Sequence, residues 1–169
     1  MRSNGVTKLN IGVFSVTFMK CQHATKSWES GHRQRCVILG YNRVAAKNIG
    51  GSGFVIFIND SHFYRFSMGC GSSTNTRAEL LAIWALLRVG LLMGIPLQLI
   101  YGDSIIIISW LNNISALDVA TLMHWCTDIR YMIHLAPLVI FKHTFREHNA
   151  LADELSKKAL HLDMGFVSF

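Results

Sequence analysis

The order of apolar segments from residue 48 onward is the feature that most limits what this chain can fold into. A continuous apolar run at 54–58 and a second strand-like segment at 62–68 are separated by Asn59-Asp60-Ser61, a pattern that predicts a β-hairpin. The pattern then alternates, predicting strands at 97–101 and 138–145 and helices at about 77–93, 104–112, 118–134 and 149–160. A hairpin followed by alternating units predicts an α/β fold with a mixed sheet.

The amino-terminal part of the chain gives weaker patterns. β-Branched and aromatic residues over 6–18, and a short apolar run at 36–41, each suggest a strand. The glycine-rich stretch 48–53 is interpreted as a turn. We interpret 69–75 as a loop, and expect Asn75 or Thr76 to cap the helix that follows.

The composition raises a membrane hypothesis, which the pattern of the longest apolar stretch argues against. Mean hydropathy is +0.32, and residues 80–101 form the best candidate span. Arg88 lies in its middle, and Gly90, Gly94 and Pro96 interrupt it. We therefore expect a buried helix, a turn and a buried strand there, and no membrane partner.

The net charge and the cysteines limit which binding partners and which cellular compartment are expected. The formal net charge of +6 is compatible with a polyanionic partner, although charge alone does not establish one. The four cysteines form no Cys-x-x-Cys pair, and the start of the chain leads into no secretory pattern. We expect a reducing, intracellular setting, with cytoplasm and nucleus both open.

Three acidic residues are placed where α/β folds gather ligand sites. Glu79 is predicted in the first turn of a helix, Asp103 directly after a buried strand, and Asp153 near the start of the last helix. Carboxylates are ligands of Mg²⁺, and two such ions about 4 Å apart can act on both oxygens of a phosphodiester cleavage. Taken singly, each acid also fits a structural role, because acidic side chains stabilise helix N-termini.

Three segments, taken in order, resemble motifs of ribonuclease H type 1 domains. Residues 74–82 (TNTRAELLA) resemble TNNxAELxA, and residues 101–110 (YGDSIIIISW) resemble the segment with Asp-Ser and a following tryptophan. Residues 145–156 (FREHNALADELS) resemble FREgNxxADxLA. The chain is similar in particular to the plant reverse-transcriptase-like group of the ribonuclease H superfamily, over about residues 44–160.

This resemblance implies a ribonuclease H-like α/β fold, with a mixed five-stranded sheet flanked by helices. It implies Mg²⁺-dependent endonucleolytic cleavage of the RNA strand of RNA–DNA hybrids. The residues that would be catalytic and would bind two metal ions are Glu79, Asp103 and Asp153.

Further residues are expected to contact nucleic acid, either an RNA–DNA hybrid or RNA, in a protein that we expect to be a monomer. The four principal candidates are Asn75, Arg77, Arg146 and Asn149. Three lysines are further candidates for phosphate contacts, although a solvated surface is an equal alternative for the last two: Lys142, Lys157 and Lys158.

One histidine and two tryptophans near the motifs are considered separately. Some ribonucleases H use a loop histidine for proton transfer, and His143 lies at a similar offset from Asn149, but within the predicted strand 138–145. Trp110 and Trp125 are expected to pack in the core.

The resemblance breaks at the first strand, where the family has a central Asp. Lys8-Leu9-Asn10-Ile11-Gly12 matches the family's KLNxDG without the Asp, and a second alignment, with residues 44–51 as the following turn, puts Arg43 in its place. Before Asp60 the only acid is Glu29. We divide the chain into a poorly matching segment 1–43, a ribonuclease H-like domain 44–162 and a tail 163–169.

Residues 12–43 are interpreted as an insertion, such as a retained intron. They also contain four residues that could form a zinc site, although their spacing is unusual for one: Cys21, His23, His32 and Cys36.

These observations predict a nucleic-acid-binding ribonuclease H-like protein whose Mg²⁺-dependent cleavage is impaired by the missing first-strand Asp. The alternative is a catalytically inactive nucleic-acid-binding or interaction domain derived from a retroelement-like ribonuclease H. A membrane or interaction protein with a hydrophobic helix is a third possibility, from a different class.

Overall fold

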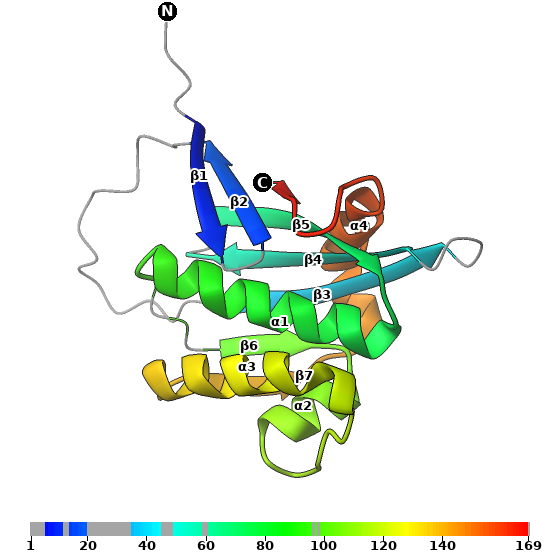
Figure 1. Cartoon of the computed structure of the whole chain (residues 1–169). Helices are drawn as coiled ribbons and strands as arrows, with labels where there is room; N and C mark the ends of the chain where they lie inside the picture. The colour runs from blue at the N-terminus through cyan, green and yellow to red at the C-terminus, as the bar shows by residue number, and fades with distance from the viewer. Residues whose placement is uncertain are drawn as a thin grey trace, which may run out of the picture.

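The computed structural model describes residues 6–11, 14–19, 35–44, 49–58, 61–95, 97 and 99–168, with side chains from residue 49 onward. Its main sheet has the strand order β7-β6-β3-β4-β5-β8 (Figure 1). The strands of this sheet are β3 (Arg35–Val44), β4 (Ile49–Phe57), β5 (Phe63–Ser72), β6 (Leu99–Gly102), β7 (Ile140–His143) and β8 (Val167–Ser168).

The sheet is mixed, as the sequence predicted. Strands β3, β4, β5 and β8 pair antiparallel, whereas β6 runs parallel to both β3 and β7. Strands β6 and β7 therefore end together at Gly102 and His143, whereas β3 continues past them to Val44. The expected ribonuclease H-like α/β architecture is confirmed, with five strands of four or more residues and the two-residue β8 added at one side.

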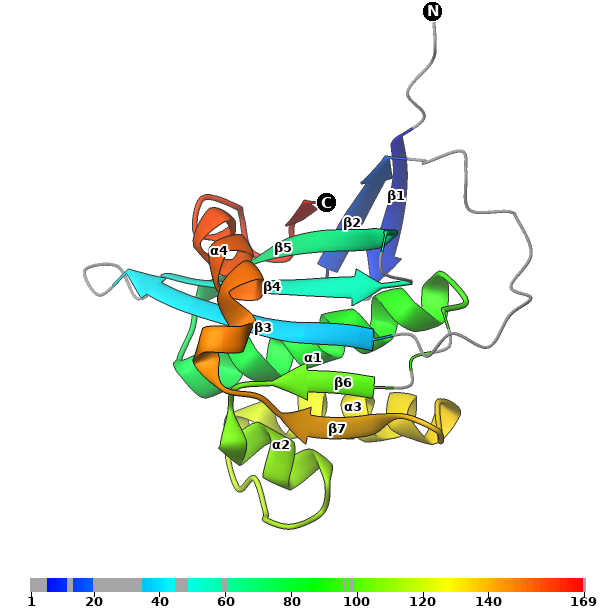
Figure 2. The ribbon, with the colours of Figure 1, turned by 180° about the vertical axis from the view of Figure 1, so that it is seen from behind.

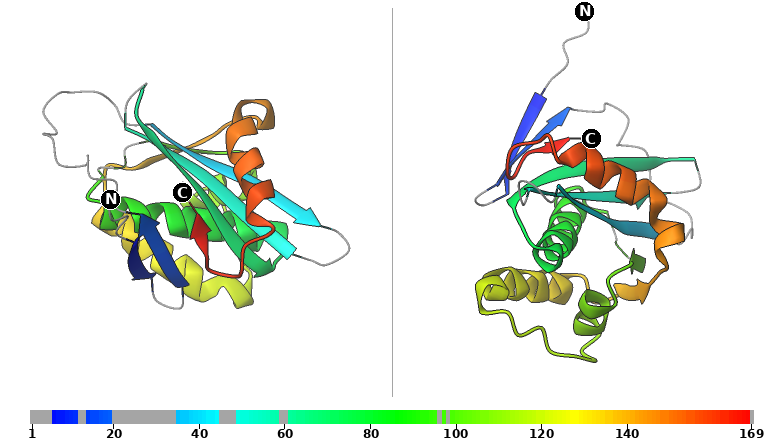
Figure 3. Two further views of the ribbon diagram at one scale, coloured as in Figure 1. Left: turned by 90° about the horizontal axis from the view of Figure 1, so that it is seen from above. Right: turned by 90° about the vertical axis from the view of Figure 1, so that its right-hand side faces the viewer.

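Helices cover both faces of this sheet. They are α1 (Asn75–Leu92), α2 (Ile105–Leu111), α3 (Met123–Leu135) and α4 (Ala150–Ala159), with short 3₁₀ turns η1 (Ala120–Leu122) and η2 (Arg146–Asn149). Helix α1 packs on one face, with α3 against it, and α4 crosses the opposite face (Figures 2 and 3). Two helices that carry predicted site residues thus approach the sheet from opposite sides.

A separate two-stranded sheet precedes the main one. Strands β1 (Val6–Ile11) and β2 (Phe14–Met19) form an antiparallel hairpin, in place of the single strand suggested over 6–18. The hairpin lies beside β8, near the end of the described chain (Figure 1).

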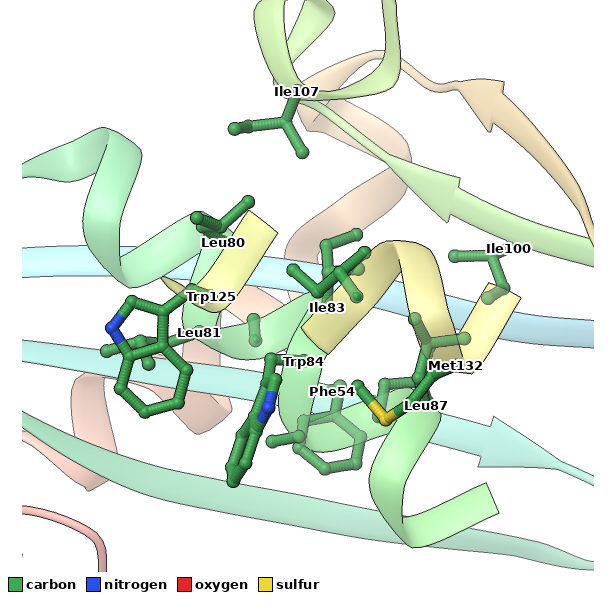
Figure 4. Packing of buried hydrophobic residues seen from close by; sticks show 14 of the residues in the cluster. Phe54, Leu80, Leu81, Ile83, Trp84, Leu87, Ile100, Ile107, Trp125 and Met132 are labelled. Carbon is green, nitrogen blue, oxygen red and sulfur yellow. The ribbon is translucent and has the colours of Figure 1, made fainter. Parts of the chain in front are cut away.

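The core lies between the sheet and α1, α2 and α3 (Figure 4). Phe54 of β4 is fully buried and stacks on Phe66 of β5, with ring centroids 4.7 Å apart. Trp84 meets Trp125 edge-to-face at 4.9 Å and joins α1 to α3. Trp110 is 7% exposed and Trp125 is 8% exposed, which confirms that both pack in the core.

The glycine-rich stretch predicted as a turn is part of strand β4, so that prediction was wrong. A β-carbon at Gly53 would lie 2.5 Å from the Ala152 carbonyl oxygen and 2.6 Å from the Leu155 β-carbon, both in α4. Gly51 is equally close to α4, at the Ser156 carbonyl oxygen. These glycines permit close approach of a helix backbone to the strand and do not mark a chain reversal.

The loop predicted at 69–75 is shorter in the structure, where only Ser73 and Thr74 lie between β5 and α1. Strand β5 continues to Ser72, and Gly71 has a φ of +62°, where glycine is favoured. Helix α1 then begins at Asn75, with Thr74 as N-cap: its hydroxyl oxygen accepts a hydrogen bond from the Arg77 amide at 3.3 Å. The cap therefore lies one residue before Asn75 and two before Thr76, the two residues predicted.

The apolar stretch 80–101 is divided between α1 and β6, as expected. Gly94 adopts a φ of +64° just after α1 ends. Within the described part of the chain, no helix is long and apolar enough to cross a bilayer. Among the proposed zinc ligands, Cys21, His23 and His32 lie outside the described residues.

Candidate functional site

The three predicted acids come from three elements that meet at the end of β6. Asp103 follows β6 directly, and Asp153 lies in the first turn of α4 on one face of the sheet. Glu79 comes from α1 on the other face. It lies in the second turn and not the first, because α1 begins at Asn75. The helix-end role considered for Glu79 is correspondingly weaker, since the dipole effect falls off within the first turn.

Glu79 lies in a setting that disfavours its charge. Burial raises its pKa, a hydrogen bond with the Ser104 side chain lowers it, and the negative charge of Asp103 raises it. Arg146 offsets part of this effect by lowering the pKa, but the net direction is upward. Glu79 and Asp103 are thus close enough to repel one another.

Asp103 has a similar balance and a wider set of neighbours. Burial raises its pKa, whereas its own backbone amide, the Arg146 charge and the Asn149 side chain lower it; Asp153 raises it further, and the net direction is upward. Asn149 is 1% exposed, and neither its side-chain nitrogen nor its oxygen has a partner in full hydrogen-bonding geometry. Its amide is nevertheless near enough to Asp103 to influence that carboxylate.

Asp153 is held by two cations. Its Oδ2 lies 2.7 Å from Nζ of Lys157, one helical turn later, and its Oδ1 lies 3.6 Å from a guanidinium nitrogen of Arg146. The Asp153 side chain is 19% exposed, and Oδ1 is buried without a hydrogen bond. The counter-charge of Arg146 is therefore what stabilises that oxygen.

Replacing Glu79 by glutamine is expected to stabilise the domain at pH 7. Because the pKa of Glu79 is raised by folding, its contribution to stability is present below its unfolded pKa and is lost as pH rises through the folded one. The substitution removes this loss, on the order of 1 kcal/mol, and the difference should vanish near about pH 4. Urea unfolding of both proteins at the two pH values measures it, and an equal or lower stability of Glu79→Gln at pH 7 would contradict it.

The two metal ions implied by the resemblance do not fit this donor set. Glu79 and Asp103 are neighbouring carboxylates, but Asp153 already has Lys157 and Arg146 against its oxygens. Among the described residues, no group of three or more His, Cys, Asp or Glu side chains is spaced to hold a metal ion. We therefore derive no catalytic step through a metal at this site.

The two segments that could match the family's first strand, residues 8–11 and the residues around Arg43, lie in different sheets of the structure. Residues 8–10 lie in β1, in the two-stranded sheet, whereas Arg43 lies near the end of β3. Strand β3 runs parallel to β6 and beside it, with Val37 opposite Tyr101. An acid facing Asp103 from this neighbouring strand would have to come from β3, whose sequence RCVILGYNRV contains no Asp or Glu.

The interval 12–43 that was interpreted as an insertion ends inside β3. The division of the chain at residue 43 stays a prediction, as does the tail 163–169, which includes β8 and its pairing with Met68 and Ser67 of β5.

The other predicted contact residues are spread around the site. Asn75 is exposed at the start of α1, and the Arg77 guanidinium donates to the Ser72 carbonyl oxygen at 2.8 Å. His143 is exposed at the end of β7, where the register places it beside Gly102. Its ring meets Phe145 edge-to-face at 5.7 Å. The roles of these residues stay predictions.

Two residues of the site were missed or misread from the sequence. Ser104 was identified in the sequence as part of the Asp-Ser motif and not as a partner of Glu79, yet its side chain forms a hydrogen bond with Glu79 and caps no backbone amide. Lys157 was considered as a phosphate contact or a solvated residue. Its position four residues after Asp153 is the spacing at which opposite charges pair on a helix, and could have predicted the ion pair.

Comparisons with known proteins agree with this architecture. The sequence model of the family described as reverse transcriptase-like matches residues 40–159. Ribonuclease H1 from the halophilic archaeon Halobacterium salinarum is 21% identical, with a TM-score of 0.69 over 76% of this chain and 98% of that chain. No curated protein matches the chain.

Two further similar structures contain nucleic acid. LC11-RNase H1, a protein isolated from compost and solved in complex with an RNA/DNA hybrid, is 24% identical, with a TM-score of 0.66 over 75% of this chain and 96% of that one. The foamy viral protease-reverse transcriptase in complex with an RNA/DNA hybrid is 17% identical, with a TM-score of 0.57 over 82% of this chain and 22% of that one. At these identities the likeness shows the fold.

Proposed function

Because the chain belongs to the reverse transcriptase-like family of domains with the ribonuclease H fold, we propose that it binds nucleic-acid duplexes, RNA–DNA hybrids in particular. We further propose that its Mg²⁺-dependent cleavage of the RNA strand is impaired. The plant group of the family remains part of this proposal, on the motifs that residues 74–82, 101–110 and 145–156 carry.

The proposed impairment of cleavage rests on the residues that surround the three acids. Asp153 is paired with Lys157 and Arg146, and β3 supplies no acid beside Asp103. A two-metal cleavage site needs carboxylates free to hold both ions against the attacking and leaving oxygens. Glu79, Asp103 and Asp153 would be the catalytic and metal-binding residues of any remaining activity.

Basic side chains beside these acids support binding of a polyanion. Arg146 has a 74% exposed side chain, Lys157 is 57% exposed, and Lys142 is exposed on β7. Exposed cations contact backbone phosphates and set register on a duplex without reading its sequence. Recognition of a hybrid would then depend on its shape and its 2′-hydroxyl groups. Asn75 and Arg77 are proposed as further contacts. Asn149, which is 1% exposed, is proposed to contribute to nucleic-acid binding through its contact with Asp103.

The binding proposal is tested by fluorescence anisotropy with a short labelled RNA–DNA hybrid at several salt concentrations. Arg146→Gln is expected to weaken binding by about tenfold and to reduce the salt slope by about 1, because one phosphate contact is lost. Arg65→Gln is the matched control: Arg65 lies over the Phe63 ring on β5, a strand that β4 and β3 separate from β6 and Asp103. Equal affinities of wild type and Arg146→Gln would contradict the proposal.

A weak ribonuclease H activity is the second candidate, favoured by the adjacent carboxylates Glu79 and Asp103. A gel assay of hybrid cleavage in Mg²⁺ compares the wild type with Asp103→Asn and with an active ribonuclease H1. Cleavage by the wild type that matches the active enzyme would overturn the proposed impairment. Equal, background cleavage by wild type and Asp103→Asn would leave binding as the function.

A further inference from the structure

Lys157 and Arg146 lie against the two carboxylate oxygens of Asp153 that a divalent cation would need as ligands. The distance of 2.7 Å from Nζ of Lys157 to Oδ2 of Asp153 is that of a charge-assisted hydrogen bond, and the 3.6 Å from Arg146 to Oδ1 is that of an ion pair. Each oxygen of this carboxylate therefore has its own cation, supplied by η2 and by the last turn of α4.

Arg146 also interacts electrostatically with Glu79 and Asp103. Its charge lowers the pKa of Glu79 and of Asp103, so its guanidinium lies within range of all three carboxylates. The site then contains three formal negative charges and two positive ones, a net formal charge of −1 in place of −3. An Mg²⁺ ion would meet a weaker attraction and two nearby cations that repel it.

From this arrangement we propose that Lys157 and Arg146 act as built-in counter-ions of the acidic site, so that the domain engages nucleic acid without a divalent metal. The nucleic-acid part of this statement rests on the proposed function. A phosphate backbone that approaches the site meets cations of the protein itself, and their exposed sides are free to contact it.

How strongly Lys157 and Arg146 weaken metal binding depends on how exposed their side chains are to solvent. Both cations are more than half exposed, and ion pairs in contact with water contribute little and are screened by salt. We therefore expect Lys157 to weaken metal binding by about tenfold and not to abolish it.

The first test measures metal binding by the free protein, without nucleic acid. Isothermal titration calorimetry with MgCl₂ is expected to show binding weaker than about 1 mM for the wild type, and about tenfold tighter binding for Lys157→Gln. Lys158→Gln is the matched control, because Lys158 forms the same i,i+4 pair on the same helix, at 2.6 Å from Glu154. Wild-type binding as tight as that of Lys157→Gln, or equal tightening by Lys158→Gln, would overturn the proposal.

The second test measures hybrid binding in EDTA and in MgCl₂ at matched ionic strength. Affinities that agree within about twofold support metal-independent binding, whereas a clear requirement for Mg²⁺ would overturn it. If the hybrid fails to bind under both conditions, the proposed function fails, and the calorimetric comparison of Lys157→Gln with Lys158→Gln still decides the role of the counter-ion.

Discussion

Replacing Gly53 by valine is expected to destabilise the domain by about 3 kcal/mol or more, because the new side chain meets backbone that cannot move alone. The added β-carbon would lie 2.5 Å from the Ala152 carbonyl oxygen and 2.6 Å from the Ser156 amide nitrogen. Relief requires α4 to move away from β4. That movement would also withdraw Asp153 from Arg146 and Asp103, so nucleic-acid binding should weaken along with stability.

Urea unfolding followed by circular dichroism measures this change, and Gly94→Ala is the control. Gly94 lies just after α1, and nothing lies within 4 Å of a β-carbon added there. Its φ of +64° still makes alanine unfavourable by about 1 kcal/mol, which is the loss expected for the control. A Gly53→Val protein as stable as the wild type would show that α4 does not pack on β4 as described.

Replacing Phe54 by alanine should cost about 3–5 kcal/mol, the range for removing a large buried aromatic side chain. Phe54 is fully buried on the opposite face of β4, and its ring stacks on Phe66 with an interplanar angle of 16°. Loss of the ring leaves a cavity beneath α1, the helix that carries Glu79. A drop in the free energy of unfolding is therefore expected together with weaker packing of α1.

Thermal and urea unfolding of Phe54→Ala and of Phe166→Ala provide the comparison. Phe166 is 50% exposed, so its loss should cost less than about 1 kcal/mol. Similar losses for the two variants would place Phe54 outside the core and contradict the packing between β4 and α1.

Strand β4 therefore sets the position of both helices that bring acids to the site. Its glycine at 53 admits the backbone of α4 on one face, and its Phe54 packs toward α1 on the other. Side-chain hydrogen bonds add to each contact: Ser52 donates to the Ala78 carbonyl oxygen at 2.7 Å, and Ser67 of β5 donates to that of Leu155 at 2.9 Å.

Helix and strand types could be predicted from the sequence because they depend on local periodicity. The long helix, the hairpin and the strand before Asp103 were all identified in order, and the three motifs placed Glu79, Asp103 and Asp153 on the correct elements. The absence of Asp and Glu from the segment that forms β3 was equally visible, since it is a matter of residue type alone. These features need no knowledge of which segments touch.

Only the tertiary structure decided what the glycines near residue 50 do, which strand lies beside β6, and what surrounds Asp153. A glycine-rich stretch has the same local signature in a turn and under a closely packed helix, so the nearby backbone of α4 had to be seen. The charge state of the site likewise depends on Arg146, Asn149 and Ser104, which reach the acids through space from η2 and from the end of β6. Such contacts join residues far apart in the chain, and Coulombic and packing energies depend on those distances and not on sequence order.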